Sequence, residues 1–91
     1  MADALHATLT ANTVTTLTLD QDYGTCEVVN VDGTAAVYFV VNSPTAPTVG
    51  GRGTLLLPAA ICGLELYPDG AQFTEVKLIS TGTPKVHIRG Y

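Results

Sequence analysis

Short runs in which apolar or β-branched residues alternate with polar ones occur along most of the chain. In residues 14–19, Val-Thr-Thr-Leu-Thr-Leu, Leu17 and Leu19 share one face and Thr16 and Thr18 share the other. A period of two is typical of a β-strand with one buried face. Threonine accounts for 14 of the 91 residues, and its β-branched side chain disfavours helix. The sequence therefore predicts an all-β protein.

The same pattern predicts about seven strands joined mostly by tight turns. They span residues 14–19, 25–31, 35–41, 54–57, 61–67, 73–80 and 85–89. Asp20–Gly24 is interpreted as a turn, and Asp32-Gly33 as a hairpin turn because glycine tolerates the positive φ required there. None of the connections is long enough to hold a crossover helix, so the sheets should be antiparallel. The expected fold is a compact antiparallel β-sandwich, jelly-roll-like, and a small closed barrel is the alternative.

The chain is short enough to form a single domain. Residues 1–12 lack a clear strand or helix pattern and are predicted to form an extended N-terminal arm, with residues 13–91 as the sandwich. The first residues contain no basic or apolar leader, and the longest apolar run, residues 35–41, is about a third of a membrane span. Synthesis in a cytoplasm and no membrane insertion are the expectations.

Charge is scarce on this chain. Only 13% of the residues are charged, against about 25% in ordinary soluble domains, while 46% are hydrophobic and the net charge is −4. A small domain with so little charge must expose neutral and aliphatic side chains, which is typical of a subunit that binds other proteins. The four Lys and Arg residues form no cluster, so nucleic-acid binding is not expected.

Few residues could bind a metal ion. Asp20–Gly24 begins like a calcium loop, but its glycine comes one position early and Val31 occupies the twelfth position, where a glutamate is needed. His6 and His87 could form a metal site only with distant partners. Cys26 and Cys62 are interpreted as small buried apolar residues, with a disulfide or metal pair as the alternative. No metal or other cofactor is expected.

Catalytic motifs are not apparent either. The serines lie in or beside predicted turns, and an arrangement of Cys62, His87 and Asp69 is the one nucleophilic site left open. Residues 50–53, Gly-Gly-Arg-Gly, lack the Gly-Lys-Ser/Thr ending and the following helix of a phosphate loop. The protein is therefore not expected to be an enzyme.

Five stretches carry a resemblance to known proteins: Pro47-Thr-Val-Gly-Gly-Arg-Gly-Thr54 continuing to Ala59, Glu75-Val-Lys-Leu-Ile-Ser80, Gly82-Thr-Pro-Lys-Val-His-Ile-Arg-Gly90, Val28-Val-Asn-Val-Asp-Gly33 and Val37-Tyr-Phe39. In turn residues and strand pattern, residues 14–91 resemble small virion proteins of tailed bacteriophages, especially those of actinobacterial hosts. The resemblance implies a capsid decoration or minor capsid protein, commonly a trimer, made in the host cytoplasm and bound to the major capsid protein on the capsid surface.

Two sets of residues are expected to form interfaces in such an assembly. Leu5 and Leu9 would be the apolar contacts of the arm, and the Pro/Gly-rich loop of residues 42–53 would contribute Pro44, Pro47, Val49 and Arg52. The alternative is a tail or baseplate module that binds a host-surface glycan through an exposed tyrosine. An unrelated enzyme or metal protein would need the cysteines and histidines to converge.

Overall fold

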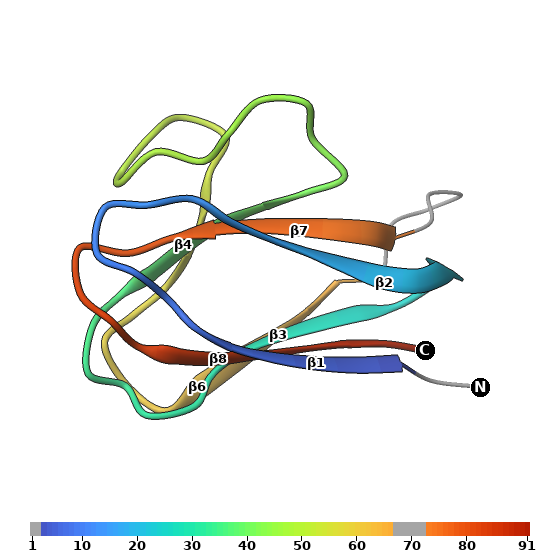
Figure 1. Ribbon diagram of the computed structural model, residues 1–91, viewed down its shortest axis with the longest axis horizontal. Helices are drawn as coiled ribbons and strands as arrows, with labels where there is room; N and C mark the ends of the chain where they lie inside the picture. The colour runs from blue at the N-terminus through green and yellow to red at the C-terminus, as the bar shows by residue number, and fades with distance from the viewer. Residues whose placement is uncertain (1–2, 67–72) are drawn as a thin grey trace.

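The computed structural model describes residues 3–66 and 73–91, which form two four-stranded sheets packed face to face (Figure 1). The first sheet contains, in spatial order, β1 (Asp3–Thr8), β8 (Lys85–Gly90), β3 (Cys26–Asn30) and β6 (Cys62–Leu66). The second contains β2 (Thr15–Tyr23), β7 (Phe73–Ile79), β4 (Val37–Val41) and β5 (Leu55–Leu57). All pairings are antiparallel, so the predicted sandwich is confirmed. No helix able to cross a membrane occurs in these two ranges.

The strand order is that of a jelly roll. Except at the β4–β5 hairpin, consecutive strands alternate between the sheets, and the chain's first and last strands are neighbours in the first sheet. The structure has eight strands where seven were expected. The additional strand is β1, which lies within the segment predicted to be an arm.

The arm prediction is therefore corrected by the structure. β1 pairs with β8 over its whole length, and Leu5 lies opposite Ile88. Leu9, just after β1, is only 1% exposed, and its backbone N–H donates a hydrogen bond of 2.9 Å to the carbonyl oxygen of Pro84. Since Leu5 and Ala7 face the core at every second position, this segment is an edge strand of the sandwich.

The core is built from the inward faces of both sheets, as the alternation predicted. Val76 and Leu78 of β7 and Val86 and Ile88 of β8 are at most 1% exposed, and Phe39 of β4 is fully buried between the sheets. The remaining core residues are Leu9, Leu19, Tyr23, Cys26, Val28, Val37, Leu57 and Phe73.

The Asp32-Gly33 hairpin prediction is wrong because β3 and β4 belong to different sheets. The connecting residues cross between the sheets around the buried side chain of Asn30. Its Nδ2 donates hydrogen bonds to the carbonyl oxygens of Ala35 (2.9 Å) and Pro58 (3.0 Å), and its Oδ1 accepts one from the N–H of Gly33 (3.2 Å). Gly33 does have the positive φ expected of it, 66°.

The predicted turn at Asp20–Gly24 is also corrected. Asp20 to Tyr23 continue β2, with a register irregularity between Thr18 and Tyr23 in the pairing with β7. Tyr23 turns into the core, and its hydroxyl donates a hydrogen bond to the carboxylate of Asp20. This interaction raises the pKa of Tyr23 to about 12. Residue 67, the last residue of the strand predicted over residues 61–67, lies outside the described residues.

Candidate functional site

The long loop of residues 42–54 presents three of its four predicted interface residues to solvent. Pro44, Val49 and Arg52 are exposed, whereas Pro47 is almost completely buried. The loop is held to the second sheet by Lys77, whose Nζ donates a hydrogen bond of 2.9 Å to the carbonyl oxygen of Ser43. An ordered loop with an exposed valine and arginine is suited to contact a protein surface. Leu5 and Leu9, in contrast, pack within their own chain.

Two exposed leucines follow this loop directly. Leu55 is 38% exposed and Leu56 is 52% exposed, and Val49 in the loop is 44% exposed. Leu55 and Leu56 are on β5, which is the last strand of its sheet, and Val49 is in the loop that precedes it. Terminal strands carry backbone groups that can pair with another chain, and apolar side chains beside them favour such contacts. We call Leu55, Leu56 and Val49 the β5 surface.

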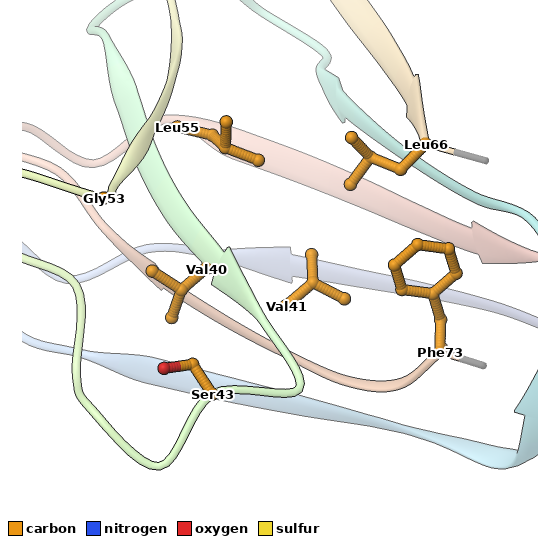
Figure 2. A pocket seen from close by; sticks show the side chains of 7 residues that line it. All are labelled: Val40, Val41, Ser43, Gly53, Leu55, Leu66 and Phe73. Carbon is orange, nitrogen blue, oxygen red and sulfur yellow. The ribbon is translucent and has the colours of Figure 1, made fainter. Parts of the chain in front are cut away.

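A groove opens between the sheets beside the β5 surface (Figure 2). β5 pairs only with Val37 to Phe39, so the end of β4 at Val40 and Val41 extends beyond it. The side chains of Val41, Leu55, Leu66 and Phe73 point toward this groove of about 480 Å³, and Val40, Ser43 and Gly53 complete its lining. Apart from the Ser43 hydroxyl the lining side chains are apolar, so the groove offers burial without reactive groups.

The two histidines meet on the outer face of the first sheet, although the sequence placed them apart. His6 of β1 lies directly opposite His87 of β8, with the two Nδ1 atoms 3.2 Å apart and the ring centroids 4.4 Å apart. The pKa of His87 is below its usual value, mainly because partial burial disfavours the charged imidazole and because His6 would add a like charge. Next to His87 on the same face, Arg89 forms an ion pair of 3.1 Å with Glu27.

The cysteines do not form a site. Cys26 lies opposite Leu66, whereas Cys62 lies opposite Asn30, so the two thiols are about 13 Å apart along the β3–β6 ladder. Neither forms a disulfide, and burial raises the pKa of the Cys26 thiol to about 11, which keeps it protonated at neutral pH. The prediction of buried cysteines is confirmed for Cys26, whereas Cys62 is half-buried.

The open nucleophilic arrangement is not assembled within the described residues. Cys62 packs against the core, whereas His87 lies on the opposite, outer face of the same sheet, and Asp69 falls outside the described ranges. Among residues 3–66 and 73–91 no three His, Cys, Asp or Glu side chains are placed to hold a metal ion together.

Aromatic side chains do not gather on the described surface. Tyr23, Phe39 and Phe73 are in the core. Tyr38 is on the outer face of the second sheet, whereas Tyr91 follows β8 of the first sheet and stacks on the guanidinium of Arg89 at 4.5 Å. Comparisons of the chain with protein-family models, curated proteins and solved structures gave no match.

Proposed function

We propose that this protein is a structural component of a bacteriophage virion, a capsid decoration or minor capsid protein. It would bind the major capsid protein on the capsid exterior as a homotrimer and cement neighbouring capsid subunits. The observation that carries the proposal is the β5 surface, an exposed apolar edge strand beside a long ordered loop. The jelly-roll topology supports it because this architecture recurs in viral capsid proteins.

The size of the molecule is compatible with such a role. Standard protein interfaces bury about 800 Å² on each partner, and the accessible surface of this chain is 4813 Å². One interface would therefore cover about a sixth of the surface, and the two interfaces of a cyclic trimer about a third. Enough surface remains for capsid binding, and many repeated contacts on a lattice multiply the strength of each one.

The solution mass of the protein and its co-sedimentation with expanded capsids test the proposal. We expect three times the mass of one chain and co-sedimentation for the unmodified protein. Leu56→Asp places a charge in the β5 surface and should reduce both. Thr16→Asp is the matched control, because Thr16 is exposed on β2 of the same sheet but at its other edge. A monomer that does not bind capsids would overturn the proposal.

Copy number distinguishes decoration from a tail or baseplate location. Quantitative mass spectrometry of purified virions should find hundreds of copies per particle for a decoration protein. Six to a few tens of copies would instead place the protein in the tail or baseplate, where glycan binding by Tyr38 or Tyr91 would be the activity to test.

A further inference from the structure

The spacing of the two histidine nitrogens matches that of two ligands on one metal ion. Imidazole nitrogens bind Zn²⁺ at about 2.0–2.1 Å, so two of them in tetrahedral geometry are about 3.3–3.4 Å apart. The Nδ1 atoms of His6 and His87 are 3.2 Å apart, within the tolerance of about 0.2 Å expected for a metal site.

Strand pairing and packing against the core hold the backbone of this pair in place. His6 and His87 are directly opposed, and the adjacent pairs, Leu5 with Ile88 and Ala7 with Val86, face the core. β8 is in turn paired with β3 on its other side. The backbone positions of both histidines are therefore set by packing, and binding of an ion requires only that the two rings, whose centroids are 4.4 Å apart, turn to direct both Nδ1 lone pairs at it.

We propose that His6 and His87 chelate a divalent transition-metal ion of the kind that prefers imidazole, with Zn²⁺ as the representative ion. The ion bridges the first and last strands of the chain through the two Nδ1 atoms. His6 is exposed, so water molecules fill the other coordination positions. Of the charged neighbours of His87, Arg89 on β8 opposes a bound cation and Glu27 on β3 favours one, and these two side chains form an ion pair of 3.1 Å. This site is independent of the proposed capsid role.

The metal-free and metal-bound pairs differ in tautomer. Without metal, the 3.2 Å contact requires that one Nδ1–H donates to the other Nδ1, so the rings are of opposite tautomers. With metal, both Nδ1 lone pairs point to the ion, so both rings carry their proton on Nε2. Long-range ¹⁵N–¹H NMR of the unmodified protein, before and after addition of ZnCl₂, should show this change. Opposite tautomers that persist at saturating Zn²⁺ would refute the chelate.

Titration calorimetry with ZnCl₂ on chelator-treated protein gives the second test. We expect one ion per chain, and His6→Ala and His87→Ala should each weaken binding at least about 10-fold, the lower end of the effect of losing even an outer-shell partner. Zn²⁺ should raise the melting temperature of the unmodified protein but not of the double variant. Thr8→Ala, two residues from His6 on the same exposed face, is the matched control and should bind normally. Binding that survives in the double variant would overturn the proposal.

Discussion

Gly33 combines a left-handed backbone conformation with close contacts to backbone atoms, so the structure tolerates its replacement poorly. Its φ is 66°, a left-handed conformation that costs other residues about 1–2 kcal/mol. A Cβ at this position would also lie 2.7–2.9 Å from backbone atoms of Ala60 and Ile61. The N–H of Gly33 is bound to Asn30, so the same residue helps to satisfy a buried amide. Gly33, in the connection between the two sheets, is therefore constrained by its backbone conformation, its close packing and its hydrogen bond.

Gly33→Ala should destabilise the protein by well over the conformational cost alone. We expect a loss of about 3 kcal/mol or more in the free energy of unfolding, because the Ala60–Ile61 backbone must move. Gly50→Ala is the matched control, since Gly50 has a φ of 69° but nothing within 4 Å of its would-be Cβ, and should cost only about 1–2 kcal/mol. Urea denaturation measures both; equal losses would show that the clash has no energetic effect.

For single residues, the sequence predicts the backbone conformation of Gly33 but not which segments surround it. Asp32-Gly33 correctly predicted a positive φ, yet the residues that surround Gly33 come from the distant β5–β6 connection. The role of Asn30 has no signal in the sequence, because a polar residue at the end of a strand gives no sign that it will be buried. Its importance follows only from the carbonyl groups that two other segments bring to it.

β1 depends on few side chains for its attachment to the sandwich. It is an edge strand, paired only with β8, and Leu5 and Ala7 pack against the core from one face. Among residues 3–12, Leu9 is the one residue that is fully buried, at 1% exposure. The attachment of the N-terminal segment therefore depends mainly on Leu9 and on the β1–β8 ladder.

Leu9→Ala should destabilise the whole domain by about 2–5 kcal/mol, as expected for a leucine removed from a packed core. Thr10→Ala, one residue further and exposed, should change the free energy of unfolding by less than about 0.5 kcal/mol. Thermal or urea unfolding followed by circular dichroism distinguishes the two. If both substitutions left the free energy of unfolding unchanged, the N-terminal segment would be a detached arm and would not pack against the sandwich.

Acidification should loosen β1 when no metal is present. The pKa of His87 is below its ordinary value of 6.5, so the unfolded chain binds more protons than the folded one as the pH falls below about 6.5. This contribution to stability is complete above pH 6.5 and is lost as the pH falls toward the folded pKa. The groups around His87 are His6 on β1, Lys85 and Arg89 on β8, and Glu27 on β3.

Unfolding at pH 7.5 and pH 5.5, with chelator present, measures this dependence. The unmodified protein should be less stable at pH 5.5, and amide exchange in β1 should rise because opening of the β1–β8 pairing exposes His87 and lets it bind a proton. His87→Gln should remove most of the difference, since histidine ordinarily titrates in this range and the pKa of His87 is lowered by folding. An equal loss of stability in the variant would assign the effect to other groups.

Most of the strands were predicted well, and β1 and the end of β2 were not. β3, β5 and β8 begin and end within one residue of their predicted ranges. β1 was missed because alanine and histidine give its alternation little contrast. The end of β2 was missed because its polar residues are typical of a turn, although an edge strand also accommodates them. The histidine pair could not be predicted, because it depends on the β1–β8 register between residues 81 positions apart.

Most strand pairs in this topology join segments that are far apart in the sequence, including the first and last strands. β1 pairs with β8, and both remaining neighbours in the first sheet, β3 and β6, are separated by the β4–β5 hairpin. Among the strands of residues 3–66 and 73–91, only β4 and β5 are consecutive in sequence and pair with each other. To pair strands that are distant in the sequence, the chain must close long loops before the strand contacts form, and this loop closure costs conformational entropy.

Folding should consequently be slow, on the order of milliseconds to seconds, with the chain termini joined last. Leu9→Ala should then mainly accelerate unfolding, because contacts that form after the transition state affect the unfolding rate. Leu57→Ala, in the local β4–β5 hairpin and 3% exposed, should instead slow refolding. Stopped-flow tyrosine fluorescence suits both, since the chain has four tyrosines and no tryptophan. If Leu9→Ala slowed refolding as much as Leu57→Ala, the β1–β8 pairing would belong to the folding nucleus, and local hairpin formation would not set the order of assembly.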